Sequence, residues 1–503
     1  MTATLPTSLS FHAAEPLFND IRELNLKKDE LAPADALLEF TAQVQISENW
    51  CWSAVATSVG VYYGTGNWTQ CAIATAQVND IIFPGELNNC CATSSSSHCN
   101  VYGYLFFSLQ QVGAFDYWES KKPTAETLFE ILSRQRELLC LRIAWYPVAS
   151  GAAHFTTICG CTNPADSDVM ATLSDTIKGV GTTTLPYADF PANYLGGGQW
   201  TDTFRTRGRF GPSQYAGTGD SIVVAIDNNG NCVSIYAMHG KLFSRVGHID
   251  PINRKVTWGN DLQFESGTQA SVALDNDANC LEVHTNDGKM FYRVGKLDVC
   301  DMTVDWQAVN EYGTGDQNSV ALADYGIALE VHRAGKHLYY QVGSVEDDGT
   351  ITWVDYVWYG NGSSNNIAID NHGNCVEVHA GIDATAGMLF FRVGKVDYIG
   401  SFRDTEPVSS IMWGADMQFD IGTAPAIALA STGECLVAFT GTGKDCGRIL
   451  FRGGKVNATR KTVEWYPRVP FDTGERASAA LNDCGKCIEL HVSGQHLFSR
   501  VGR

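Results

Sequence analysis

The line KMFYRVGKLD, residues 289–298, has five further versions in the chain, all after residue 240. They read KLFSRVGHID, HLYYQVGSVE, MLFFRVGKVD, ILFRGGKVN and HLFSRVGR. The glycines that close the six versions are 48, 48, 51, 60 and 48 residues apart: Gly247, Gly295, Gly343, Gly394, Gly454 and Gly502. Each unit opens with an alternating segment such as SVALDNDANCLEVH, and all but the last continue to a tryptophan: Trp258, Trp306, Trp353, Trp413 and Trp465.

This repeat predicts the architecture of the C-terminal part. Alternation with a period of two predicts strands, and the Gly, Asn and Asp residues between them favour tight turns. About four strands in a unit of roughly 50 residues are typical of a β-propeller blade, whereas a solenoid would need capping units. We therefore expect an all-β six-bladed propeller over residues 201–503. The last unit ends before its tryptophan segment, and the stretch at residues 204–219 can supply the missing strand and close the ring.

The N-terminal part has a different pattern. Helical periodicity covers residues 51–64 and 124–139, and strands are expected at 140–147, 153–161 and 169–174. Three consecutive glycines in YLGGGQW, residues 194–200, indicate a linker. The chain is therefore expected to be multidomain. It would have an N-terminal extension over residues 1–38, an α+β domain over residues 39–200, and then the propeller.

Composition limits the possible partners. The formal net charge of −20 disfavours nucleic acid as a main partner, and no apolar run is long enough to predict a membrane span. The first twenty residues lack a basic region followed by an apolar stretch, so we expect no secretory signal peptide. The expected location is cytoplasmic, or exported without a classical signal. We expect no cofactor and no resident metal.

The segment QISENWCWSAVATSVGVYYG, residues 45–64, contains the strongest candidate for a catalytic residue. Cys51 follows a polar run and opens a helical pattern, where the helix dipole and unpaired amides favour a thiolate. Gln45 lies six positions earlier, so its amide and the backbone N–H of Cys51 could together hold an oxyanion. A thiol nucleophile also needs a base, and His154 is the only histidine in residues 100–238.

The residue that orients the base can be inferred from hairpin geometry. His154 opens the alternating segment AHFTTICGC, and TNPADSD forms a turn before the return strand VMATLSD. Residues equidistant from a turn face each other in an antiparallel pair, and Asp175 satisfies this condition for His154. Asp168 is the second choice, because it would need a turn inside the apolar strand.

Together these residues resemble the papain-like cysteine proteases. The pattern Q-x5-C-W is matched by Gln45, Cys51 and Trp52, and NWCWSA is similar to a box in a branch of bacterial plant-effector proteases and related fungal proteins. Further similar segments are QCAIA, Cys90–Cys91, Cys99–Asn100, LRIAW, H-x-T-x-I-x-G and LPYADF, within residues 39–200. The segment SDT differs from the Asp-Pro of many relatives.

The resemblance implies a cysteine peptidase that hydrolyses peptide or protein substrates. In it Cys51 is the nucleophile, His154 the base, Asp175 the orienting residue, and Gln45 an oxyanion donor. Two alternatives remain open: a deamidase or acyltransferase that uses the same residues, and a lectin or interaction protein whose enzyme domain is silent.

The cysteine-rich segment NNCCATSSSSHC, residues 88–99, is a weaker candidate for a functional site. It could hold zinc through Cys90, Cys91, His98 and Cys99, but adjacent cysteines are poor tetrahedral ligands. Structural thiols, or a disulfide that includes Cys71, are the preferred interpretation.

The propeller half resembles the sugar-binding β-propellers of bacteria and fungi, which implies a multivalent glycan ligand. Two repeated features could form the binding sites or could stabilise the blades. One is the set of five tryptophans named above. The other is an E-x-H pair that recurs on one strand of four units: Glu282–His284, Glu330–His332, Glu377–His379 and Glu489–His491.

Overall fold

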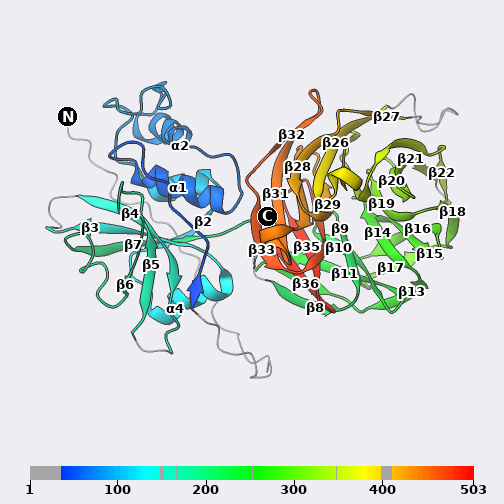
Figure 1. Cartoon of the computed structure of the whole chain (residues 1–503), viewed down its shortest axis with the longest axis horizontal. Helices are drawn as coiled ribbons and strands as arrows, with labels where there is room; N and C mark the ends of the chain where they lie inside the picture. The colour runs from blue at the N-terminus through cyan, green and yellow to red at the C-terminus, as the bar shows by residue number, and fades with distance from the viewer. Residues whose placement is uncertain are drawn as a thin grey trace.

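The computed structural model describes residues 35–147, 152–165, 168–211, 213–251, 253–346, 348–397 and 410–502. The expected extension over residues 1–38 therefore lies outside the described residues, apart from residues 35–38. Figure 1 shows two parts side by side: a helix-and-sheet part formed by the N-terminal residues and a ring of sheets formed by the rest.

The described residues of the N-terminal part form a seven-stranded sheet in the order β2-β7-β3-β4-β5-β6, with β1 paired to β4. All of the pairings are antiparallel. The strands are β1 Ala36–Leu37, β2 Phe115–Glu119, β3 Leu139–Trp145, β4 Ala153–Cys161, β5 Met170–Ser174, β6 Thr182–Pro186 and β7 Gly198–Thr206.

Strand β7 corrects the sequence-based interpretation of residues 194–200. These residues were expected to be a linker, but Gly198 begins a strand that lies between β2 and β3. A Cβ added at Gly198 would lie 2.6 Å from Cγ2 of Ile143, so this glycine permits close packing. The sheet consequently continues to Thr206, beyond the boundary expected at residue 200.

Four α-helices occur in the described part of the N-terminal half: α1 Cys51–Tyr62, α2 Gln70–Gln77, α3 Leu105–Gln111 and α4 Ala125–Glu130. Short π-helical turns, Val78–Ile82 and Ile131–Gln135, continue α2 and α4. The helix α1 is buried from Cys51 to Gly60 and contacts α2, α3 and β4. A helix that is apolar on all sides belongs in a core. The packing of α1 therefore fixes the position of Cys51 at its N-terminus.

Six further sheets, one for each sequence repeat, are present in the described C-terminal residues. Their inner strands contact one another in sequence, and the inner strand of the sixth sheet contacts that of the first, which closes a six-bladed propeller. In the first five blades the outermost position is shared by two short strands, which pair with opposite halves of the third strand. No helix in the described ranges is long and apolar enough to cross a membrane.

The strands of the six blades follow the order of the chain, with one exception in the last blade. Blades one and two contain β9 Ser221–Ile226, β10 Asn231–Met238, β11 Lys241–Asp250, β12 Lys255–Trp258, β13 Leu262–Ser266, β14 Thr268–Leu274, β15 Asn279–Asn286, β16 Lys289–Asp298, β17 Thr303–Trp306 and β18 Asn310–Thr314. Blades three and four contain β19 Asp316–Leu322, β20 Ile327–Ala334, β21 His337–Val345, β22 Ile351–Trp353, β23 Val357–Asn361, β24 Ser363–Ile369, β25 Asn374–Ala380, β26 Met388–Asp397, β27 Ser410–Trp413 and β28 Met417–Ile421. Blades five and six contain β29 Thr423–Leu429, β30 Glu434–Thr440, β31 Arg448–Asn457, β32 Thr462–Trp465, β33 Val469–Thr473, β34 Glu475–Leu481, β35 Cys487–Ser493, β36 His496–Gly502 and the earlier strand β8 Gln214–Thr218.

The ring closes as the sequence predicts. Strand β8, which precedes the first blade in the chain, pairs with β36 at the end of the chain and completes the sixth blade. An isolated bridge between Phe210 and Gly502 extends this contact. Only part of the predicted segment 204–219 takes this role, because residues 204–206 belong to β7.

The glycine that closes each repeated segment has a packing function. In each of the first five blades it lies directly opposite the tryptophan of the next strand, as in the pair Gly295 and Trp306. A Cβ at Gly295 would lie 2.6 Å from Cε3 of Trp306, and the same distance separates Gly343 from Trp353. The indole therefore covers a position that only glycine can occupy.

A belt of hydrogen bonds joins all six blades through one short polar residue in a turn of each. The backbone N–H of each belt residue donates to a side-chain oxygen of the next, over 2.5 to 3.2 Å, until the circle returns to the first blade. The belt consists of Asn228, Asn276, Asp324, Asn371, Ser431 and Asp483.

Candidate functional site

Cys51 is the first residue of α1, and two tryptophans hold it there. Trp50 and Trp52 are at most 1 % exposed, and their indole N–H groups donate to the carbonyls of Cys99 and Val101. The same interaction pattern continues upstream, because the backbone N–H of Asn49 donates to Oδ1 of Asn100 over 3.0 Å. The loop that leads into the cysteine is therefore fastened to the segment over residues 99–101.

Two disulfides brace that segment. Cys71 of α2 is bonded to Cys91, and Cys90 is bonded to Cys99. The preferred interpretation of a disulfide that includes Cys71 is thus confirmed, and these cysteines serve as covalent links next to the loop before Cys51. Within the described ranges, no group of three or more His, Cys, Asp or Glu side chains is arranged to hold a metal ion.

His154 and Asp175 lie in direct contact, as the hairpin argument predicts. The imidazole Nε2 of His154 is 2.8 Å from Oδ1 of Asp175, and both residues are at most 5 % exposed. The strand register differs from the simple expectation, because Ser174 pairs with Thr157. Asp175 therefore leaves the end of β5, and its side chain reaches diagonally to His154. The alternative partner, Asp168, lies at the far end of the same hairpin, before β5 begins.

His154 also interacts with the thiol of Cys51, so both the sulfur and the Asp175 carboxylate act on the imidazole. Since Nε2 faces Asp175, Nδ1 is the ring nitrogen that faces the sulfur. Burial lowers the pKa of His154, but the hydrogen bonds and negative charges of Asp175 and Cys51 outweigh burial and raise that pKa to about 9. The arrangement therefore favours a protonated imidazole beside the ionised Asp175 carboxylate.

Gln45 lies beside this centre but is engaged with the backbone. Its backbone N–H donates to the carbonyl of Thr176, the residue after Asp175. Its side-chain nitrogen donates to the carbonyls of Ser47 and Glu48, over 3.2 and 2.6 Å. Gln45 thus bridges the Asp175 segment and the loop before Cys51. Its side-chain amide would have to turn in order to donate to a substrate oxyanion.

Sequence reasoning missed two aromatic residues at the centre. The ring of Trp145 is stacked on His154 with centroids 6.1 Å apart, and Tyr194 packs against Trp145. Trp145 could have been found, since it lies in the strand predicted over residues 140–147, which pairs with the strand of His154. No sequence signal indicates Tyr194, because it lies in the irregular segment between β6 and β7.

The E-x-H pairs of the propeller are internal. All eight side chains are at most 2 % exposed, and in each pair the histidine Nδ1 lies 2.9 to 3.2 Å from the neighbouring glutamate. Of the two interpretations left open by the sequence, this geometry favours stabilisation of the blades, because each buried carboxylate is paired with an imidazole. The pairs are Glu282–His284, Glu330–His332, Glu377–His379 and Glu489–His491.

Four of the five repeated tryptophans pack between blades. Trp353, for example, lies against Tyr292 and Tyr312 of the preceding blade, with centroids 6.0 and 5.8 Å away. Trp306, Trp413 and Trp465 make equivalent contacts with aromatic rings of the blade before them. Trp258 differs, because the Arg245 guanidinium of its own blade lies 4.1 Å from its ring centroid.

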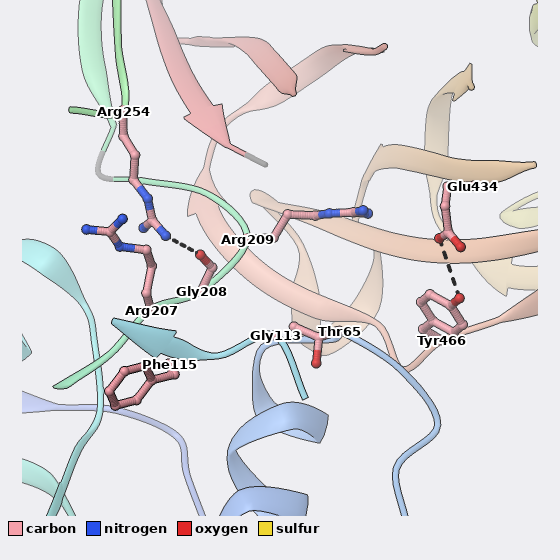
Figure 2. Close-up of a pocket in the computed structure, with 9 residues that line it drawn as sticks. All are labelled: Thr65, Gly113, Phe115, Arg207, Gly208, Arg209, Arg254, Glu434 and Tyr466. Carbon is pink, nitrogen blue, oxygen red and sulfur yellow. Dashed lines mark hydrogen bonds between the residues drawn. The ribbon is translucent and has the colours of Figure 1, made fainter. Parts of the chain in front are cut away.

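A cavity of about 130 Å³ lies where the two parts of the chain meet (Figure 2). Arg254 donates there to the carbonyl of Gly208 and is paired with Glu137 at 3.3 Å. Thr65 lines the cavity just beyond the C-terminal end of α1. At about 1.5 Å per residue, α1 separates the cavity from Cys51 by roughly 18 Å. The lining residues are Thr65, Gly113, Phe115, Arg207, Gly208, Arg209, Arg254, Glu434 and Tyr466.

Ionic contacts pair two of the arginines that line the cavity, Arg207 and Arg254. Arg207 is paired with Asp116 at 2.8 Å, and burial raises the pKa of Glu137 to about 7 despite the nearby Arg254. The described residues that line the cavity include neither a cysteine nor a histidine. The cavity therefore joins the two parts of the molecule and is separate from the Cys51 centre.

Comparison with known proteins leaves the function open. No family model and no curated protein matches the sequence. Among solved structures, the NanB sialidase of Streptococcus pneumoniae is similar over 77 % of this chain and 99 % of its own, with 8 % identity and a TM-score of 0.41. A Lactobacillus plantarum protein is similar over 56 % of this chain and 82 % of its own, with 13 % identity and a TM-score of 0.34. These likenesses are too distant to carry an argument about activity.

Proposed function

We propose that the N-terminal part is a papain-like cysteine peptidase that hydrolyses peptide bonds at Cys51. The observation that carries the proposal is the position of His154, which is hydrogen-bonded to Asp175 and interacts with the Cys51 thiol. A thiol, an imidazole and a buried carboxylate in this order form the arrangement that activates a cysteine nucleophile.

In the proposed reaction, His154 holds the proton of Cys51, and the thiolate attacks the scissile carbonyl carbon. Among the described residues, the backbone N–H of Cys51 has no acceptor, so it can donate to the developing oxyanion. Gln45 would add a second donor once its amide turns. His154 then gives its proton to the leaving amine, which leaves a thioester on Cys51. A water molecule, deprotonated by His154, hydrolyses the thioester and releases the carboxylate and the free thiol.

The test compares wild type with Cys51→Ala and Cys51→Ser in a peptide-library cleavage assay read by mass spectrometry. We expect cleavage by wild type only, and we expect iodoacetamide to alkylate Cys51 first and abolish cleavage. Equal cleavage by Cys51→Ala would overturn the proposal. Deamidation would instead shift a peptide by about one dalton without producing two fragments. A silent enzyme domain would give neither product.

We also propose that the propeller binds glycans, at positions other than those expected from the sequence. The observation in favour is a pair of exposed aromatic sites on blades three and six. Trp358 and Tyr356 are 57 % and 60 % exposed, and Tyr215 is 63 % exposed. An exposed aromatic face with polar neighbours suits the apolar face of a sugar ring. Two such sites on one ring would bind through avidity.

The repeat offers a matched control for this second proposal. Trp358 is paired with Tyr339, and Gln263 takes the same position opposite Phe243 in blade one. We expect the full chain to bind a subset of a glycan array, and Trp358→Ala to weaken that binding while Gln263→Ala does not. Binding unchanged by Trp358→Ala and Tyr215→Ala would place the ligand elsewhere, and no binding to any glycan would favour a protein partner.

A further inference from the structure

The carboxylate of Asp175 is fixed on both of its oxygens. Oδ1 is 2.8 Å from Nε2 of His154 and accepts the backbone N–H of Ile177, also over 2.8 Å. Oδ2 accepts the hydroxyl of Tyr194 over 2.7 Å. Asp175 itself is 1 % exposed, so water cannot readily replace any of these donors. The Tyr194 hydroxyl is the side-chain donor on the oxygen that does not face the histidine.

Tyr194 is held rigidly at this position. It is 4 % exposed, and its ring contacts Phe190 edge-on and Trp145 at an intermediate tilt, with centroids 5.7 and 6.2 Å away. Trp145 in turn is stacked on His154, with 15° between the ring planes. Tyr194 therefore touches the carboxylate with its hydroxyl and the aromatic cover of the imidazole with its ring.

This geometry has a consequence for the imidazole. A carboxylate held only through Oδ1 could rotate about its Cβ–Cγ bond and lose its alignment with Nε2. A donor on Oδ2 fixes the plane of the carboxylate, and that plane orients the ring so that Nδ1 faces the sulfur. Burial and the charge of Asp175 hold the pKa of Tyr194 well above its ordinary range, so its hydroxyl stays a donor. The pKa of Asp175 is below its ordinary value despite burial, because His154, Ile177 and Tyr194 all donate to it.

We propose that Tyr194 is a positioning residue of the Cys51 centre, acting through Asp175 to fix the orientation of His154. This proposal rests on the peptidase function proposed above. It adds a fourth side chain, from the segment between β6 and β7, to a centre otherwise built from α1 and the hairpin of β4 and β5.

The test is Tyr194→Phe, which keeps the ring and its packing and removes only the hydroxyl. A hydrogen bond to a charged group is worth enough that we expect kcat to fall roughly 10-fold, with KM little changed. We also expect the alkaline limb of the pH profile to move below its wild-type position near pH 9, because a misaligned carboxylate no longer sustains the raised pKa of His154.

Tyr187→Phe is the matched control. Tyr187 lies in the same segment, is also 4 % exposed, and donates its hydroxyl to the carbonyl of Pro123 over 2.8 Å without touching the centre. This variant loses a buried hydrogen bond, so a purely structural effect would appear in both variants. We expect its kcat and its pH profile to match those of wild type.

A measurement that needs no substrate separates the two proposals. The imidazole of His154 can be titrated by NMR in wild type and in both variants. We expect its pKa to fall in Tyr194→Phe alone, and an unchanged titration would overturn the positioning role. If wild type cleaves no peptide while the titration still shifts, the peptidase function fails and the positioning role stands. If Cys51-dependent cleavage is intact and equal in both variants, only the positioning role fails.

Discussion

His154 determines the electrostatics of the N-terminal centre, since its imidazole is the group that becomes a cation beside the Asp175 carboxylate and the Cys51 thiol. Its charge is favoured by contact with Asp175 and Cys51 more strongly than it is opposed by burial. Proximity to Asp175 could be inferred from the sequence, because a hairpin places residues at equal distances from a turn together. The Tyr194 contact could not be inferred, since it depends on how a segment outside the hairpin folds back onto Asp175.

The raised pKa of His154 predicts a pH dependence of stability. This pKa is about 9 in the folded chain, against 6.5 for an unperturbed histidine. A raised pKa means that the folded state binds the proton more tightly. The stabilisation is therefore complete below pH 6.5 and is lost as the pH rises to about 9. We expect a loss on the order of 1–3 kcal/mol over this window in wild type.

The measurement is chemical unfolding across this window, followed by tryptophan fluorescence. His154→Gln should show a smaller loss than wild type, because its own contribution is gone and the raised pKa values of His379 and His491 still contribute in the same direction. His98→Gln should retain the wild-type loss, since His98 is an exposed imidazole outside the centre. The same pH dependence in wild type and in His154→Gln would contradict the assignment.

At the scale of elements, the most informative pairing is that of the glycine closing each repeated segment with the tryptophan opposite it. In blades two to five the indole covers the glycine and contacts an aromatic ring of the preceding blade, so one strand pair also joins two blades. Trp306, for example, is opposite Gly295 and is stacked on Phe264 at 5.6 Å. The glycine of the first five blades is thus a packing requirement and needs no ligand to explain it.

Gly295→Ala should therefore be destabilising. The added Cβ would lie 2.6 Å from Cε3 of Trp306 and 2.7 Å from Cγ1 of Val304, and neither side chain can move without opening the blade. We expect a loss of about 1–3 kcal/mol in the free energy of unfolding. Gly313→Ala is the control in the same blade, because its Cβ would meet only the flexible end of Met290, at 3.0 Å. If the two variants lose the same free energy of unfolding, contact with the Trp306 indole is not the reason that glycine is needed at position 295.

The sequence predicts the regular elements well and their junctions poorly, for physical reasons. Strands with period-two alternation, the blade count and helix α1 depend on local patterns and agree with the structure. The linker expected at residues 194–200 was wrong, because glycine serves there to let β7 approach Ile143. The E-x-H pairs show the same limit of sequence patterns. Alternation predicts that the two residues share a face of a strand, but it does not predict whether that face is buried or exposed.

At the scale of the whole molecule, ring closure depends on two kinds of contact between distant parts of the chain. Strand β8 adds to the last blade, and the polar belt joins every blade to the next. Asn228 carries the closing link of the belt. It donates its amide to Oδ2 of Asp483 over 3.1 Å and accepts the backbone N–H of Asp483 over 2.9 Å. No local pattern indicates this belt, because its members face one another only when the ring is closed.

Asn228→Ala should weaken closure of the ring specifically. The variant loses both side-chain hydrogen bonds to the last blade and leaves the backbone N–H of Asp483 without its acceptor. We expect a loss of about 1–3 kcal/mol in the free energy of unfolding, with faster proteolysis near β8 and β36, the strands that close the ring. Asn229→Ala is the neighbouring control, because that side chain is exposed and should change stability by at most about 0.5 kcal/mol. If both variants unfold and are cleaved alike, the belt does not contribute to closure, and the β8–β36 pairing alone holds the ring.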